Sequence, residues 1–167
     1  SSLDAFGGFS RSQISALGAL AEYLDATQKG KLPILRPPRV ELKADSMQID
    51  AATRRNLELT KSINKGTKHG SLLGTIDLTV TAAGGRLLER RISSPSMDLA
   101  LIKNRHQALE FLIDNVELSE TLTTLLKSVP DLERALSRVS LDRAGPRDLI
   151  NICRSLAQGK QIAKSFK

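Results

Sequence analysis

Apolar residues recur along most of this chain at the alternating spacings of three and four that are typical of amphipathic helices. The first stripe follows Ser10, a suitable N-cap, and ends before Gly30. Its members are Ile14, Leu17, Ala21 and Leu24. The longest pattern follows a turn at residues 93–98 and consists of Leu99, Ile102, His106, Leu109, Ile113 and Val116. We expect this pattern to form a long helix that packs lengthwise against other helices.

Shorter patterns predict further helices on both sides of the long one. Asp50, Ser71 and Thr81 are each placed to cap a short helix, the first of them over residues 51–60. Gly84 or Gly85 is expected to let a neighbouring backbone come close. Later helices are expected on Leu118, Leu122, Leu125 and Val129, on Leu132, Leu136 and Val139, and, after Pro146, on Leu149, Ile152, Cys153 and Leu156.

Two segments interrupt this helical pattern. Three prolines within residues 31–39 forbid a helix there and favour an extended connector. Residues 40–49 are typical of two short strands around Ala44–Ser46, which would form a small hairpin. The predicted fold is therefore mostly α, a multi-helix protein with long packed helices and one small β element, with a segment boundary at the connector.

Composition constrains the core and the compartment. Hydrophobic residues make up 40% of the 167 residues and aromatic residues only 3%, so Leu, Ile and Val must fill the core. The single cysteine, Cys153, allows no internal disulfide and fits a reducing, cytoplasmic compartment. There is no apolar run long enough to cross a membrane and no signal peptide. The chain starts without methionine and ends without a helix-ending signal, which suggests a piece of a longer protein.

Charge leaves two interpretations open. Lysine and arginine number 25 against 18 acidic residues, and the net charge of +7 is compatible with a polyanionic partner. The basic residues are, however, spread among acids, as on an ordinary solvated surface. None of the aromatic residues is interleaved with a basic run, so direct reading of nucleic-acid bases is not expected.

Candidate sites for catalysis or metal binding are weak. The loop Gly66–Ser71 resembles a phosphate loop only superficially, because Gly70 stands where the lysine of such a loop is required. His69 and His106 have no second histidine or cysteine at metal-ligand spacing. Cys153 lies on an apolar stripe and is interpreted as a small core residue.

The stretch at residues 130–149 carries four arginines, which raises the question whether it binds DNA. Asp131 and Arg134 can pair across one helical turn, while Arg134 and Arg138 repel unless an acid from elsewhere faces them. Pro146 is suited to the first turn of a helix, and Asp148 complements its dipole. These spacings favour a joint between two helices over a DNA-binding surface.

Several segments resemble the MutS family of DNA mismatch-repair proteins. They are IDAATRRNLELT at residues 49–60, GSLLGTIDLTVTAAGGRLLERRISSP at 70–95, PSMDLALIKNRHQALEFL at 95–112 and DLERALSRVSLDRAGPRDL at 131–149. The resemblance runs from about residue 10 to the end. The chain departs from the family pattern at Ile76, at Ala83 and at Arg91, which stands where a tryptophan is common.

The resemblance implies which part of such a protein this is. Residues 1–38 would be a helix and proline-rich connector to the preceding domain, and residues 39–167 the first part of the helical core and lever, before the DNA clamp. The mismatch-reading and Walker motifs are absent, so no catalytic, cofactor or metal residue is expected. Structural or coupling roles are implied for Asp131, Glu133, Arg134, Arg138, Pro146, Arg147, Asp148, Arg105, Arg86 and Asp77.

The resemblance also implies the function of the parent protein. It would recognise mispaired or unpaired bases and would be a weak DNA-dependent ATPase that uses ATP and Mg²⁺. A homodimer, a MutL-type partner and a bacterial, cytoplasmic, nucleoid-associated location are further implications. The alternative is a free-standing helical nucleic-acid-binding or adaptor protein.

Overall fold

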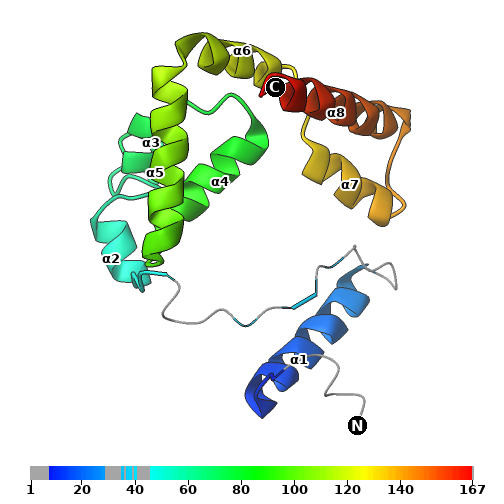
Figure 1. Ribbon diagram of the computed structural model, residues 1–167. Helices are drawn as coiled ribbons and strands as arrows, with labels where there is room; N and C mark the ends of the chain where they lie inside the picture. The colour runs from blue at the N-terminus through cyan, green and yellow to red at the C-terminus, as the bar shows by residue number, and fades with distance from the viewer. Residues whose placement is uncertain (1–7, 29–34, 36, 39, 41–45, 167) are drawn as a thin grey trace.

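The computed structural model describes residues 8–28, 35, 37, 38, 40 and 46–166, which are almost entirely helical (Figure 1). The helices are α1 Arg11–Gln28, α2 Ala51–Asn56, α3 Leu72–Ile76, α4 Ala82–Ser93, α5 Leu99–Asp114, α6 Val116–Lys127, α7 Leu132–Ser140 and α8 Pro146–Lys164. Extended pairing in the described residues is limited to one antiparallel bridge between Ser46 and Ser96. The predicted mostly α class is confirmed.

Helix starts agree closely with the predicted caps. The side chains of Asp50, Ser71 and Thr81 accept hydrogen bonds from backbone N–H groups in the first turns of α2, α3 and α4, at 2.9, 3.1 and 3.0 Å. Asp98 caps α5 in the same way, with 2.9 Å to the N–H of Ala100. These contacts satisfy donors that a helix leaves unpaired at its N-terminus, and their partners are only two or three residues away in sequence.

Two predicted helices end earlier than expected. The helix predicted over residues 51–60 ends at Asn56, because Glu58 takes a left-handed backbone conformation with φ of 49°. The long pattern ends at Asp114, so that Val116 begins the next helix. At this break the Asn115 side chain donates to the Phe111 carbonyl at 2.7 Å, which is the competition with helical hydrogen bonding expected of asparagine.

Helix packing buries small residues. The helices in substantial contact are α3 with α4, α5 with α6, α6 with α8, and α7 with α8. Ala135 in α7 and Ser155 in α8 retain only 2% and 6% of their surface. The Ser155 hydroxyl donates to the Pro130 carbonyl at 3.4 Å, at the entrance to α7. Small side chains at such positions let helices approach closely.

The predicted seam along α5 is not buried by other parts of the described chain. Leu99 and Ile113 expose 62% and 71% of their surface, and His106 is exposed as well. Leu136, Val139, Leu149 and Leu156 on α7 and α8 are also exposed. The prediction that Cys153 is a core residue is wrong, because this thiol is exposed. The apolar stripes are correct as patterns, but the helix pairs of this chain cover other faces.

The close backbone approach lies at a different glycine from the predicted one. A Cβ on Gly74 would lie 2.2 Å from the Lys68 carbonyl oxygen, whereas the nearest atoms to Gly84 are threonine side-chain atoms. Residues 41–45 of the hairpin predicted over 40–49, and residues 31–34, 36 and 39 of the predicted connector, lie outside the described residues. In the described part of the predicted hairpin, Ser46 forms its bridge with Ser96. Among the described residues, no helix is both long and apolar enough to cross a membrane.

Candidate functional site

Arg86 of α4 joins the start of α7 through a charged cluster. Its Nη1 and Nη2 atoms donate to the two carboxylate oxygens of Asp131, each at 2.9 Å, and Nη2 also donates to Glu133 Oε2 at 2.8 Å. The two partners are 45 and 47 residues away in sequence. Such a two-pronged contact fixes direction as well as distance, so it can hold α4 and α7 in one relative orientation.

Asp131 both pairs with Arg86 and caps α7. Besides binding Arg86, its Oδ1 accepts the backbone N–H of Arg134 at 3.2 Å and so caps α7. The Arg86 guanidinium lowers the pKa of this carboxyl, and the Arg134 N–H lowers it further, while burial raises it. The hydrogen bonds from Arg86 to Asp131 and Glu133 raise the pKa of Arg86 in turn. The carboxylate therefore stays ionised at neutral pH, as both the cap and the ion pair require.

A second cluster forms the joint between α7 and α8. Arg138 Nε donates to Asp148 Oδ2 at 3.0 Å, and Arg138 Nη2 donates to the Arg143 carbonyl at 2.8 Å. The Gly145 N–H also donates to Asp148 Oδ2, at 2.9 Å. The pKa of Asp148 is lowered first by the Gly145 N–H and then by Arg138. Pro146 follows as the first residue of α8. The predicted joint is therefore tied together across its loop.

The predicted pairing within α7 needs correction. Asp131 contacts Arg134 through the backbone N–H, and the guanidinium that it binds belongs to Arg86. An N-cap carboxylate turns toward the free N–H groups of the first turn, which leaves its outer side open to a cation from another helix. Arg138 contacts Asp148, an acid outside α7, which offsets the repulsion that the spacing of Arg134 and Arg138 predicts.

The remaining predicted residues lie apart from these two clusters. Asp77 pairs with Lys68 and accepts from Thr79, and the Lys68 contact leads the lowering of its pKa to about 2. Arg105 in α5 is half-buried, and its Nε atom has no hydrogen-bond partner among the residues that the structure describes. Arg147 is exposed in the first turn of α8. Sequence reasoning missed Lys68, since a loop residue nine positions from its acid gives no periodic signal.

The chemistry available in these clusters is that of structural joints. In the described part of the chain, no three histidine, cysteine, aspartate or glutamate side chains are grouped so that they could hold a metal ion. His69 and His106 are both exposed. Paired arginines and carboxylates fix one helix against the next and leave no activated nucleophile in the two clusters.

Comparison with known proteins agrees with this picture. The family model for MutS domain III matches residues 52–167. The chain belongs to the MutS family. Over 161 residues it is 56% identical to the "DNA mismatch repair protein MutS" of Cereibacter sphaeroides, which covers 96% of this chain and 18% of that relative. The corresponding protein of Ruegeria pomeroyi is 56% identical over 162 residues, covering 97% of this chain and 18% of the relative.

A third MutS relative, from Dinoroseobacter shibae, is 52% identical over 164 residues, covering 98% of this chain and 19% of the relative. The chain therefore spans about a fifth of the length of these relatives. The resemblance drawn from the motifs is confirmed: the chain is homologous to a part of MutS. The alternative of an unrelated, free-standing helical adaptor does not hold, because the domain III match covers most of the chain.

Proposed function

We propose that this chain is a transmission segment of a DNA mismatch-repair protein, in which it couples the nucleotide state to the opening of the DNA clamp. The observation that carries the proposal is the bidentate Arg86–Asp131 contact between α4 and α7. Helices move as stiff bodies, and a directional contact between two of them favours one discrete arrangement over others. Coupling needs such an element, whose equilibrium can be biased from either side.

The two joints act in series through α7. Arg86 holds the N-terminal end of this helix, and Arg138 holds the other end to α8 through Asp148. All four side chains retain contact with solvent. Exposed ion pairs contribute modestly to stability and exchange readily, so they are suited to contacts that form in one state and open in another.

The rest of the proposal concerns the whole protein. We propose that it recognises mispaired or unpaired bases, that it is a weak DNA-dependent ATPase using ATP and Mg²⁺, and that it works as a homodimer with a MutL-type partner. A bacterial, cytoplasmic and nucleoid-associated location belongs to the same proposal. So does the division into a connector at residues 1–38 and a core and lever segment at residues 39–167.

A double substitution in the full-length protein that carries this segment tests the proposal. Pro146→Gly with Arg147→Ala loosens the start of α8, and we expect slower ATP-driven release from mismatched DNA or a lower melting temperature, with mismatch affinity unchanged. Gly159→Ala with Lys160→Ala, later in the same helix, is the matched control. A loss of mismatch affinity with normal release and normal melting would contradict the assignment.

A second test concerns the chain by itself. As a transmission segment it should hydrolyse no ATP above the level of a heat-inactivated sample. Turnover that persists through further purification and scales with protein concentration would show that the segment has chemistry of its own.

A further inference from the structure

A single residue, Asn115, separates α5 from α6, and the chain turns there from the axis of one helix into that of the other (Figure 1). Asn115 has φ of −113° and ψ of 70°, which is not a helical conformation. Its own helical hydrogen bonds are nevertheless intact. Its N–H donates to the Phe111 carbonyl at 3.2 Å, and its carbonyl accepts from the Ser119 N–H at 3.0 Å. The break between the two helices is therefore confined to the backbone rotation of one residue.

The first turn of α6 lacks the hydrogen bonds that a continuous helix would give it. The N–H groups of Val116, Glu117 and Leu118 have no backbone partner among the described residues, and no side chain caps this helix. A cleft of about 550 Å³ is lined by these three residues, so this turn borders open space. A continuous helix over residues 99–127 would pair the three N–H groups with the last carbonyls of α5.

The Asn115 side chain supports the bend. Its Nδ2 atom donates to the Phe111 carbonyl at 2.7 Å, the same oxygen that accepts the Asn115 N–H. An asparagine side chain competes in this way with helical bonding, and asparagine is a weaker helix former than alanine. The apolar period nevertheless runs through the bend, since Val116 continues the spacing of Leu109 and Ile113. The sequence is therefore compatible with both a bent and a continuous helix at this point.

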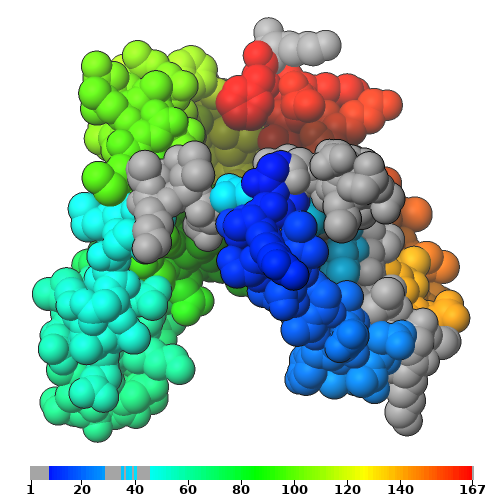
Figure 2. Space-filling model, turned by 90° about the horizontal axis from the view of Figure 1, so that it is seen from below, coloured from blue at the N-terminus to red at the C-terminus, as the bar shows by residue number. Residues whose placement is uncertain are grey.

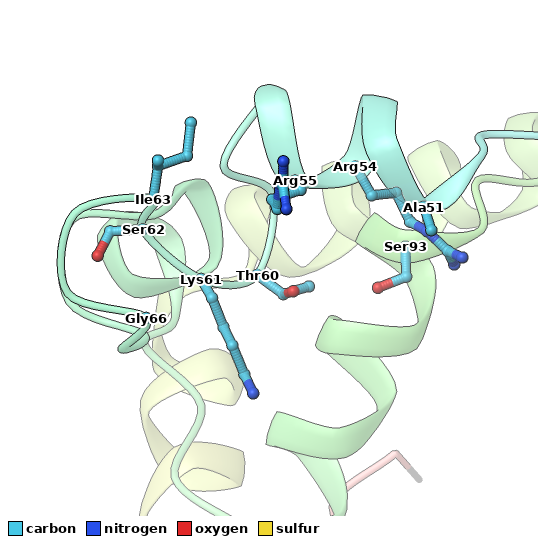
Figure 3. Close-up of a pocket in the computed structure, with 9 residues that line it drawn as sticks. All are labelled: Ala51, Arg54, Arg55, Thr60, Lys61, Ser62, Ile63, Gly66 and Ser93. Atoms are coloured by element: carbon cyan, nitrogen blue, oxygen red, sulfur yellow. The ribbon is translucent and has the colours of Figure 1, made fainter.

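The chain before Asn115 is connected within itself. The Met47 N–H donates to the Pro95 carbonyl at 2.8 Å, directly before α5, and the Leu73 N–H of α3 donates to the Leu59 carbonyl at 2.9 Å. Figure 3 shows a cleft whose walls come from α2, the loop that follows it and the end of α4. The described residues that line this cleft all precede Asn115. A rotation at Asn115 therefore leaves these contacts unchanged.

The three helices after Asn115 are also connected to one another. α8 is in substantial contact with both α6 and α7. Arg138 of α7 donates to Asp148 of α8 at 3.0 Å, and the Ser155 hydroxyl of α8 donates to the Pro130 carbonyl at the entrance to α7. All these contacts lie after Asn115, so we expect α6, α7 and α8 to move together as one body.

Contacts between these two halves of the chain are limited. Among the described helices, the pair in substantial contact across Asn115 is α5 with α6, which adjoin it. The ion pairs of Arg86 with Asp131 and Glu133 also cross it, at 2.9 and 2.8 Å. All three of these side chains are accessible to solvent, and exposed ion pairs open at modest cost. Their opening would leave the second half free to rotate at Asn115.

We propose that Asn115 is a hinge about which α6, α7 and α8 rotate as one body, and that the second state is a continuous helix over residues 99–127. The Arg86 ion pairs hold the bent state. This inference deepens the proposed transmission role and rests on it, because it names the residue about which the segment moves.

The test measures the distance between two spin labels in the full-length protein, without nucleotide or DNA. The labels are attached at Lys103→Cys in α5 and Lys127→Cys in α6, which are both exposed, after Cys153 and any other cysteine have been replaced by serine. A continuous helix places the two Cα atoms about 36 Å apart, and the bend brings them closer. Labels at Ser137→Cys and Gln161→Cys, both within the second half, form the control pair.

We expect mainly the shorter distance when Arg86 and Asn115 are unchanged. Arg86→Gln opens the ion pairs, and Asn115→Ala removes the competing side chain and favours the helix. Each should raise the fraction of molecules near the longer distance at least twofold, and the double variant should raise it further. Asn115→Gly is the matched control, because it loses the same side chain but disfavours the helix, and it should not raise that fraction. The control pair should keep one distance in every variant.

A distance that stays short in the folded double variant would overturn the hinge, and so would a broadened distribution without the longer distance. If the double variant loses its helical circular dichroism, Asn115→Ala alone decides. The hinge and the transmission role can fail separately. A fixed short distance, with ATP-driven release slowed by Arg86→Gln, would remove the hinge and keep the role. The longer distance with normal release would keep the hinge and remove the role.

Discussion

Gly74 is the residue whose identity the local geometry restricts most directly. A Cβ at this position would lie 2.2 Å from the Lys68 carbonyl oxygen, and the obstacle is backbone that cannot rotate away. Gly74→Ala should therefore lower the free energy of unfolding by about 1–3 kcal/mol, the usual cost of forcing extra atoms into a packed site. Urea unfolding followed by circular dichroism measures this change.

Gly159→Ala is the matched control for that experiment. Gly159 lies inside α8, and a Cβ there would meet nothing within 4 Å. Alanine in a helix interior should raise the free energy of unfolding by about 0.5–1 kcal/mol. If both substitutions stabilised the protein, the close approach at Gly74 would not be a real constraint.

Asp131 should make stability depend on pH. Its folded-state pKa lies below the ordinary value of 3.8, so its contribution is fully present above that value and is lost as the pH falls through the folded-state pKa. Asp131→Asn keeps a capping oxygen but removes the charge. We expect the variant to lose less unfolding free energy between pH 5 and more acidic conditions, as measured by urea unfolding across that range.

Asp114→Asn at the end of α5 is the control for this pH experiment, because it removes a carboxylate that belongs to neither joint. It should keep the acid sensitivity of the unchanged protein. If both substitutions reduced the pH dependence of the unfolding free energy equally, Asp131 would contribute no more to acid unfolding than Asp114 does.

At the scale of elements, the packing of α7 and α8 depends on a small buried residue. Ala135 retains only 2% of its surface, whereas the adjacent Leu136 retains 44%. Ala135→Leu should lower the free energy of unfolding by about 1–3 kcal/mol through overpacking, and Leu136→Ala should cost clearly less. Thermal melting of the two variants side by side measures the difference. A larger loss for Leu136→Ala would show that the apolar stripe, and not the small residue, holds these helices.

The helices and their caps could be predicted because they depend on neighbours in sequence. Asp50, Ser71 and Thr81 cap the helices that directly follow them, and their hydrogen bonds reach only three residues ahead. Burial could not be predicted in this way. The period of α5 identifies one apolar face, but whether another helix covers that face depends on packing between distant elements.

The two charged clusters differ in the same way, because one joins residues close in sequence and the other joins residues far apart. The Arg138–Asp148 pair spans ten residues, and spacing alone indicates that Arg134 and Arg138 repel unless an acid faces them. The Arg86–Asp131 pair spans 45 residues, and spacing rules give no information at that range. The family resemblance implies structural or coupling roles for both residues, but their direct contact comes from the fold.

At the scale of the whole molecule, the α1 ribbon lies apart from the other helices in Figure 1, and its blue atoms lie toward the viewer in Figure 2, where α8 is red. Much apolar surface on α5, α7 and α8 stays exposed. A chain with so few buried side chains cannot draw its rigidity from a deep core alone. Directional contacts between helices, above all the one from Arg86 to α7, therefore bear on how these helices move together.

The most direct test of that claim is ATP-triggered release of a mismatched duplex by the full-length protein, measured for Arg86→Gln, Asp131→Asn and the double variant. Arg86 and Asp131 act as one contact in this account, so each single substitution should slow release, and the double should be no slower than the worse single. Mismatch affinity before ATP addition should be unchanged. Release at the unmodified rate in all three variants, or additive slowing in the double variant, would contradict the account.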